Sequence, residues 1–279
     1  MDATIKKQLE ITACSIRMSI IEGVFNAKSG HPGGSLSIAD LLTYLYFAKL
    51  DVYPENPDFE DRDRVVLSKG HCAPGLYAAL AERGFFSKDE LKSLRHIGAL
   101  LQGHPCIHIP GVDMSSGSLG QGISAACGIA LSGKISAKPY KVYAIVGDGE
   151  LEEGQVWEAA MFAAHNKLDN LVAIIDNNNL QIDGCIGDVC SPYPIVDKFQ
   201  AFGWHVITMD AHDFDSIERA FDEAEKIAFQ PVAIVQKSVK GKGVSFMENK
   251  AEWHGTAPNK EQYDRAMAEL SEALAELKK

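Results

Sequence analysis

The chain has 279 residues, which allows one large domain or two small ones at roughly 100–200 residues per domain. Hydrophobic residues make up 46% and charged residues 23%, a composition that excludes a disordered or fibrous chain. With 27 Lys and Arg against 38 Asp and Glu, the net charge is −11. This charge argues against a general nucleic-acid binder, because such proteins carry a basic face.

The sequence predicts no targeting or membrane segment. The first residues contain lysines but lack the apolar core of a signal peptide, and no apolar run is long enough to cross a bilayer. The six cysteines include no C-x-x-C pair, and the nearest two, Cys185 and Cys190, have no histidine beside them. This spacing argues against a zinc site. We therefore expect reduced thiols in a cytoplasmic protein.

The first quarter of the chain is predicted to be helical. Apolar residues at helical spacing form one stripe near the start: Ile5, Leu9, Ile16 and Ile20. Ser37 and Asp40 have the spacing of a capping box, which predicts a second helix through about Phe47. Ser87 and Glu90 repeat the same signal for a further helix.

The middle of the chain is predicted to alternate between strands and helices. Residues 141–146 (KVYAIV) and 170–175 (NLVAII) are short, apolar runs of the kind found in buried parallel strands. Between them, one helical face is formed by Val156, Ala159, Ala160 and Ala163. Further strands are predicted at 64–67, 205–209 and 232–236. The pattern predicts a single α/β domain over residues 1–279, with a mostly parallel sheet flanked by helices on both faces.

Two polar clusters follow neighbouring strands, where an α/β sheet binds its ligands. Gly147, Asp148 and Gly149 follow the first strand, and residues 176–179 (DNNN) follow the second. Carboxylate, amide and carbonyl oxygens suit Mg²⁺, which completes its coordination with water and phosphate oxygens. Each cluster alone is also typical of a turn. Together at one edge of the sheet they favour a metal site.

A glycine-rich loop supports an anionic ligand. Residues 115–122 (SSGSLGQG) lead into a helix-like stretch, so unpaired N–H groups and the positive end of the helix dipole would face the ligand. The dipole contributes only about 0.3–1 kcal/mol, so a metal and direct hydrogen bonds must supply more. The spacing matches neither the dinucleotide fingerprint nor the P-loop.

Four histidines lie in loops rich in Gly or Pro, namely His31, His71, His104 and His254. Imidazole moves protons near neutral pH and can bind hydroxyl or phosphate groups, so this shared setting favours a functional role. The other five are interpreted as surface histidines: His96, His108, His165, His205 and His212.

These segments resemble the thiamine-diphosphate enzymes, and most closely the N-terminal half of transketolases. The stretch from GDGELEEG to IIDNNNLQIDG resembles the cofactor motif of the family, in which an asparagine follows GDG by about 30 residues. SGHPGG, SKGH, QGHP, SSGSLGQG, KGKG and WHG resemble further transketolase segments in family order. The resemblance extends over nearly the whole chain.

The resemblance implies thiamine diphosphate and Mg²⁺ as cofactors, with Ca²⁺ or Mn²⁺ as alternatives. Asp148, Asn178 and the backbone carbonyl of Leu180 match the family's metal ligands. The positions that match cofactor contacts are His71, Gly117, Ser118, Leu119, Asp148, Gly149, Glu153, Asn178 and His254. The catalytic residues it implies, which hold the sugar and assist proton transfer, are His31, His104 and His254.

Glu153 carries two interpretations. In the family, the matching carboxylate lies where the two cofactor-binding halves meet. From the sequence alone, an exposed acid in the first turn of a helix explains Glu153 equally well.

Transketolases are more than twice as long as this chain, which ends where their second domain would begin. We therefore expect the N-terminal subunit of a split transketolase, which transfers a two-carbon ketol unit from a ketose to an aldose. A C-terminal partner would supply the glutamate that activates the cofactor, in a heterotetramer with two copies of each subunit. Pentose phosphates are the default substrates, and branched or sulfonated sugars stay open.

Three alternatives stay open beside this interpretation. One is an enzyme similar to deoxyxylulose-phosphate synthase, and a second is the alpha chain of a 2-oxo acid dehydrogenase, whose motifs fit the histidine segments poorly. The third is a regulatory subunit that binds the cofactor without catalysis. The retained histidines argue against it, because binding alone needs no proton transfer.

The last predicted element is an amphipathic helix over about 259–279. Its apolar stripe consists of Tyr263, Met267, Leu270, Leu274 and Leu277. This stripe either packs on its own domain, which we favour, or docks on a partner.

Overall fold

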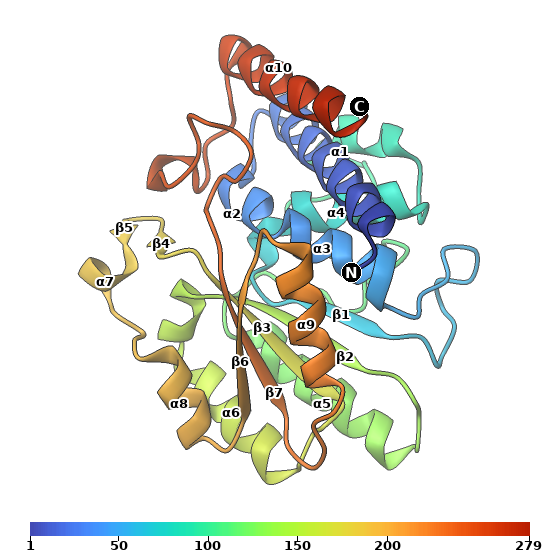
Figure 1. Ribbon diagram of the computed structural model, residues 1–279, viewed down its shortest axis with the longest axis vertical. Helices are drawn as coiled ribbons and strands as arrows, with labels where there is room; N and C mark the ends of the chain where they lie inside the picture. The colour runs from blue at the N-terminus through green and yellow to red at the C-terminus, as the bar shows by residue number, and fades with distance from the viewer.

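The computed structural model describes residues 1–279 and is built around a five-stranded sheet in the order β1-β2-β3-β7-β6, with every neighbouring pair parallel (Figure 1). The strands are β1 (Arg64–Leu67), β2 (Val142–Gly147), β3 (Leu171–Asn177), β6 (His205–Asp210) and β7 (Val232–Lys237). All five predicted strands are confirmed. A small antiparallel hairpin, β4 (Leu180–Gln181) and β5 (Gly184–Cys185), follows β3.

The sheet is buried on both faces, which explains the nearly continuous apolar character of its strands. Successive side chains point to opposite faces. In β2, Tyr143 and Ile145 belong to one core cluster, and Ala144 and Val146 belong to the other.

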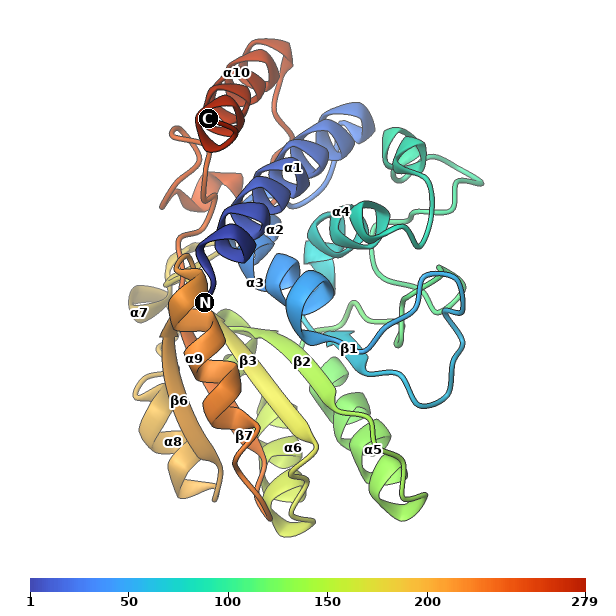
Figure 2. The ribbon, with the colours of Figure 1, turned by 45° about the vertical axis from the view of Figure 1, so that its right-hand side comes forward.

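Helices cover each face of the sheet (Figure 2). One face packs against α5 (Gln121–Ile135), α6 (Gly154–His165) and α8 (Ile195–Ala201). The other packs against α1 (Ala3–Ala27), α3 (Ala39–Tyr44), α4 (Ala73–Arg83) and α9 (Phe214–Ala224). The remaining helical elements are α2 (Pro32–Ser37), η1 (Leu45–Lys49), η2 (Gly70–Cys72), η3 (Lys88–Ser93), η4 (Gly149–Glu152), α7 (Ile186–Val189), η5 (Ala251–Trp253) and α10 (Lys260–Leu277). The two-sided α/β architecture is thus confirmed.

Local details of the N-terminal region differ from the prediction. Ile5 is exposed, although Leu9 lies in the core as expected. Ser37 ends α2 instead of capping a helix, because its hydroxyl donates to Gly34 and to the buried Asp176. The element after Ser87 is a short 3-10 helix in which Ser87 accepts a bond from a backbone N–H. Both capping-box interpretations were therefore wrong in detail.

The C-terminal helix α10 packs along α1, so its apolar stripe lies against its own domain (Figures 1 and 2). Tyr263 stacks on Phe25 with ring centroids 4.1 Å apart, and Leu270 is 2% exposed. A full capping box between Asn259 and Gln262 begins the helix. The interpretation that we favoured for this helix is confirmed.

Two further expectations concern the whole chain. All six cysteines are free thiols. None of the helices combines the length and the apolar character that crossing a membrane requires.

The docking of α10 gives a stability prediction. Leu270→Ala removes a buried side chain between α10 and α1, so we expect the free energy of unfolding of the chain to fall by about 2–4 kcal/mol. Urea unfolding followed by circular dichroism measures this change. Glu272→Ala, at an exposed position of the same helix, is the control. Equal stability of the two variants would show that α10 is not docked in solution.

Candidate functional site

A cavity of about 520 Å³ opens at the carboxyl ends of the parallel strands. Asp148 and Gly149 enter it after β2, Asn178 and Leu180 after β3, and Lys240 after β7. In a parallel sheet these strand ends meet at one edge, so residues far apart in sequence line one space. The two polar clusters predicted to meet do so, since Gly147 and Asp176 are paired in the register of β2 and β3.

Asp148 is a buried carboxylate with no positively charged partner. One oxygen accepts the backbone N–H of Gly149 at 2.9 Å, and the other accepts that of Asn179 at 2.6 Å. Burial, reinforced by the negative charge of Asp176, raises the pKa of Asp148 to about 7. A cation beside this carboxylate would relieve that electrostatic cost.

Two more oxygens face the same cavity. The amide nitrogen of Asn178 donates to Asp176 at 3.0 Å, and this bond fixes the orientation of the side chain and hence of its oxygen. The carbonyl oxygen of Leu180 accepts the Nζ of Lys240 at 2.8 Å, which shows that this oxygen is accessible to a cation. Together with Asp148, these groups are hard oxygen donors of the kind that Mg²⁺ prefers.

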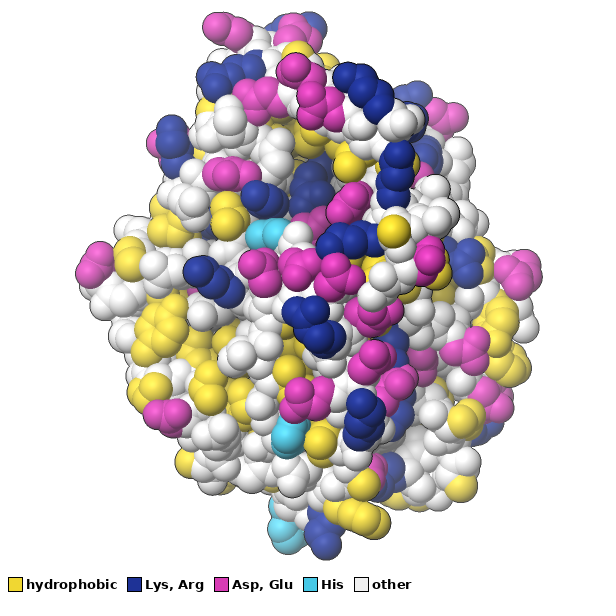
Figure 3. Space-filling view, viewed as in Figure 1, with side chains coloured by type: hydrophobic (Ala, Val, Ile, Leu, Met, Phe, Trp, Pro, Cys, Tyr) yellow, Lys and Arg dark blue, Asp and Glu magenta, His cyan; other side chains and the backbone are white.

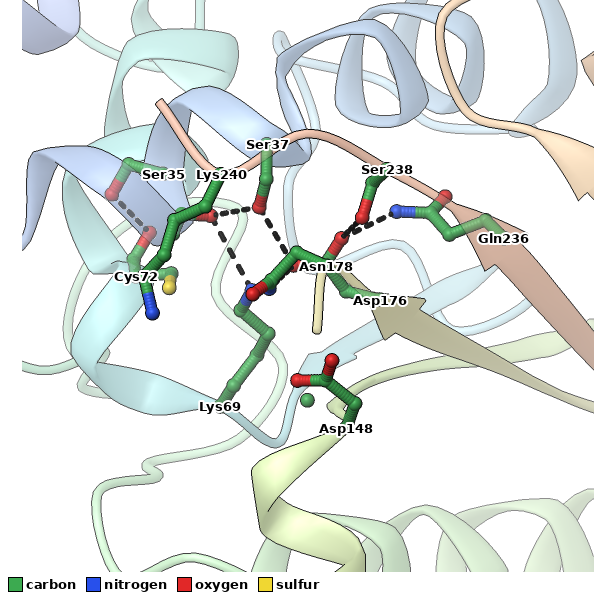
Figure 4. Close-up of polar contacts among 12 residues, drawn as sticks. Ser35, Ser37, Lys69, Cys72, Asp148, Asp176, Asn178, Gln236, Ser238 and Lys240 are labelled. Atoms are coloured by element: carbon green, nitrogen blue, oxygen red, sulfur yellow. Dashed lines mark hydrogen bonds and ion pairs between the residues drawn. The ribbon is translucent and has the colours of Figure 1, made fainter. Parts of the chain in front are cut away.

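Asp176 is the centre of a buried network below the cavity (Figure 4). It pairs with the ammonium of Lys69 and accepts bonds from Ser37, Asn178, Gln236 and Ser238, of which the Ser37 bond is 2.6 Å and the Gln236 bond 2.9 Å. Burial alone would raise the pKa of Asp176, but the Lys69 charge and these donors hold it well below its usual range. Both partners of the pair are therefore charged, and the network joins β1, β3 and β7 to α2.

The glycine-rich loop reaches the cavity at Gly117 and Leu119 and leads into α5, as predicted. Gly120 precedes the helix with φ +81°, a conformation that favours glycine. The buried carboxylate of Glu150 accepts the N–H of Gly120 at 2.8 Å and that of Gly147 at 3.0 Å. This side chain therefore ties the loop to the end of β2.

Three of the four singled-out histidines form a cluster on the opposite side of the cavity. The ring centroids of His31 and His71 are 5.1 Å apart, those of His71 and His254 are 5.1 Å apart, and those of His31 and His254 are 5.5 Å apart. The Nδ1 atom of His31 is buried and has no hydrogen-bond partner. Such an atom is costly to leave unpaired, so it points to a ligand that would satisfy it.

The histidines of the site are neutral at neutral pH. Burial, followed by nearby positive charge, lowers the pKa of His31 to about 4 and that of His254 to about 3. The pKa of His71 is lowered well below its usual value by burial and by Lys69, and that of His104 is lowered by burial and by Arg95. Each neutral ring offers one N–H donor and one acceptor.

Most of the residues singled out from the sequence line the cavity. They are His31, His71, Gly117, Leu119, Asp148, Gly149, Glu153, Asn178, Leu180 and His254. Ser118 lies in the loop and is not part of the lining. His104 also lies outside the lining, although its ring is 3.5 Å from where a Cβ on Gly117 would stand. Glu153 is exposed at the rim, at the N-cap of α6, and makes no capping bond.

Sequence reasoning missed two buried lysines of the site. Lys69 follows β1, and Lys240, whose pKa is lowered to about 8 by burial and by Lys69, follows β7. Both strands had been predicted, so the rule that selected Asp148 at a strand end would also have selected these lysines. His212 was wrongly interpreted as a surface histidine, since its ring is bonded to Asp40 and is only 13% exposed.

Comparison with known proteins gives one family. The family model described as transketolase, thiamine diphosphate binding domain, matches residues 8–272. One of the two subunits of an apulose-4-phosphate transketolase from Phocaeicola vulgatus is 42% identical over 271 residues, covering 97% of this chain and 96% of that protein. The 6-deoxy-6-sulfo-D-fructose transketolase subunit SqwG of a Clostridium species is 44% identical over 263 residues, covering 94% and 96%.

Longer proteins match in one part only. Human transketolase is 42% identical over 280 residues, which cover 97% of this chain but 43% of the human protein. The crystal structure of transketolase from Campylobacter jejuni superposes with a TM-score of 0.91 at 31% identity, covering 99% of this chain and 46% of that one. The chain thus spans less than half the length of these proteins.

The lowered histidine pKa values give a pH prediction. Between about pH 6.5 and pH 4 the unfolded chain binds more protons at His31 than the folded chain, so this residue costs stability as the pH falls through that window. We expect His31→Asn, which cannot take up the proton, to gain stability relative to wild type when the pH is lowered from 7 to 5. Urea unfolding at both values measures this, with the exposed His165→Asn as the control. A difference that does not change with pH would contradict the neutral assignment.

Proposed function

Since this chain belongs to the transketolase family, through its thiamine diphosphate binding domain, we propose that it is the cofactor-binding subunit of a two-chain transketolase. The observation that carries the proposal is the cavity at the strand ends, where Asp148, Asn178 and Leu180 face the histidine cluster. Two relatives named as transketolase subunits support the division into two chains, because this chain covers 96% of each. The family model favours this function over a deoxyxylulose-phosphate synthase.

We propose that the cavity holds Mg²⁺ and the diphosphate of the cofactor. No group of three or more His, Cys, Asp or Glu side chains is arranged to hold a metal, so the site depends on mixed oxygen donors and on phosphate oxygens. Asp148 supplies the negative charge, and Asn178 and the carbonyl of Leu180 complete the protein's share. The uncompensated charge of Asp148 supports this fit. Lys240 and the backbone at Gly117 and Leu119 would face the diphosphate.

The remaining residues would act on the sugar. Thiamine diphosphate, when bound, supplies the carbanion that cleaves and re-forms the carbon–carbon bond next to a ketose carbonyl. His31 and His254 are neutral, so each can donate a hydrogen bond to a substrate oxygen or accept its proton. His104, at the loop beside Gly117, would hold a hydroxyl further from the reacting carbon. His71, almost fully enclosed, would pack beside the thiazolium ring.

A partner subunit would complete the site. We propose that it supplies the glutamate that activates the aminopyrimidine, with two copies of each subunit in the assembly. Glu153 supports a contact at this rim, since it is exposed beside the cavity and its carboxylate has no bond within the chain. A cytoplasmic location stays a prediction that rests on the six free thiols.

The substrate pair is proposed by class. The two subunit relatives are named for apulose 4-phosphate and 6-deoxy-6-sulfo-D-fructose, both sugars with an anionic end. We therefore propose a ketose donor with a phosphate or sulfonate group, with pentose phosphates as the default. Arg95 supports an anionic substrate, because it makes no ion pair within the chain and acts electrostatically on His31 and His104.

The metal assignment is tested at Asp148. We expect Asp148→Ala to weaken Mg²⁺-dependent binding of thiamine diphosphate by more than the roughly 10–100-fold that changes outside the coordination sphere cause. Isothermal titration calorimetry with and without Mg²⁺ measures the affinity. Asp183→Ala, an exposed carboxylate on the nearby hairpin, is the matched control. Unchanged affinity in Asp148→Ala would rule out the metal site.

The division of labour is tested by reconstitution. We expect the purified chain to show no ketol transfer alone and to gain it when a matched C-terminal transketolase subunit is added, because the activating glutamate would come from that subunit. A coupled assay with a pentose phosphate pair, and with a sulfonated ketose, measures the activity. Full activity of the chain alone would refute the split site.

A further inference from the structure

Lys240 reaches the cavity from an irregular segment, residues 238–243, which follows β7. Its ammonium lies 2.8 Å from the carbonyl oxygen of Leu180 and 3.0 Å from Nδ1 of His254. A lysine side chain on a loop has many rotamers, so a fixed position requires that the backbone of the loop is held. Several of the bonds that hold this segment come from behind the cavity, on the side away from the site.

A polar cluster forms that back support. Below α10, Figure 3 shows a hollow with Lys and Arg side chains in its floor, and a cavity of about 230 Å³ there is lined by Arg17, Asp40, His212 and Lys242. Arg17 donates to the carboxylate of Asp40 at 2.5 Å and to the carbonyl of Lys242 at 3.1 Å. Asp40 is buried, and the mechanism proposed above uses none of these four residues.

His212 joins this cluster to the segment. Its Nδ1 lies 2.7 Å from the same oxygen of Asp40, and its Nε2 accepts the backbone N–H of Val239 at 2.9 Å. Because Nε2 accepts a hydrogen bond, the ring proton lies on Nδ1 and points to the carboxylate. Asp40 thereby selects the tautomer that can hold the residue directly before Lys240, as carboxylates do for histidines that must present one nitrogen.

We propose that His212, oriented by Asp40, is a positioning residue that fixes Lys240 for binding the diphosphate of the cofactor. The inference rests on the proposed function, since Lys240 needs a ligand to position for. His212 does not touch the cavity, so its effect reaches the ligand only through Val239 and Lys240.

Two substitutions separate the two bonds of His212. Asn places its polar atoms near the position of Nδ1, so His212→Asn retains a donor to Asp40 and loses the acceptor for Val239. Gln extends further, so His212→Gln retains an acceptor near the position of Nε2. We expect His212→Asn to weaken Mg²⁺–thiamine diphosphate binding about 10-fold, as supporting residues around a bound ion do, and His212→Gln to recover most of that loss.

A double-mutant cycle with Lys240→Met tests whether the effect passes through Lys240. In the Lys240→Met background, His212→Asn should change the affinity less than about 2-fold. His205→Asn, which breaks a histidine–carboxylate pair of 2.9 Å at the other end of β6, is the matched control and should leave the affinity unchanged. An equal loss from His212→Asn in both backgrounds, or no loss in the wild-type background, would overturn the proposal.

Hydrogen exchange of the full chain without cofactor gives an independent reading. We expect amides of residues 238–243 to exchange at least about 10-fold faster in His212→Asn than in wild type, with thermal unfolding showing that the fold is retained. Unchanged exchange would overturn the anchoring role. If wild type fails to bind the cofactor while exchange responds as expected, the proposed function fails and the anchoring role stands.

Discussion

The buried carboxylate of Asp176 is the interaction on which the arrangement of the site depends. It is fully enclosed at the end of β3, and it receives the ammonium of Lys69 and four neutral donors. Removing one partner of such a pair would leave an uncompensated buried charge, which costs about 3–5 kcal/mol in proteins. The network therefore holds strand ends together that backbone pairing alone leaves free to diverge beyond the sheet.

The same carboxylate also shapes the electrostatics of the cavity above it. Its negative charge raises the pKa of Asp148, while Lys69 lowers the pKa of His71 and of Lys240. The cavity thus combines one carboxylate without a counter-ion and several neutral or weakly basic groups. A metal–phosphate ligand, which carries both signs of charge, suits this combination better than a simple anion or cation does.

Much of the fold and part of the site could be predicted from the sequence. The buried strands were found because both faces of a parallel sheet demand apolar residues, and Asp148 and Asn178 followed from the position of strand ends. The capping interpretation of Ser37 failed because the hydroxyl serves a tertiary contact with Asp176, which no local spacing reveals. Likewise, His212 looks like any loop histidine until the fold brings Asp40 and Val239 to it from distant segments.

The order of the sheet has a consequence for how the protein is made. β7 is the last strand in the chain, yet it lies between β3 and β6 and carries the segment that places Lys240. During synthesis, the cofactor site cannot exist until nearly the whole chain has left the ribosome, because the central gap in the sheet stays open until then. The vitamin-derived ligand would therefore meet an almost finished domain and could not guide its early collapse.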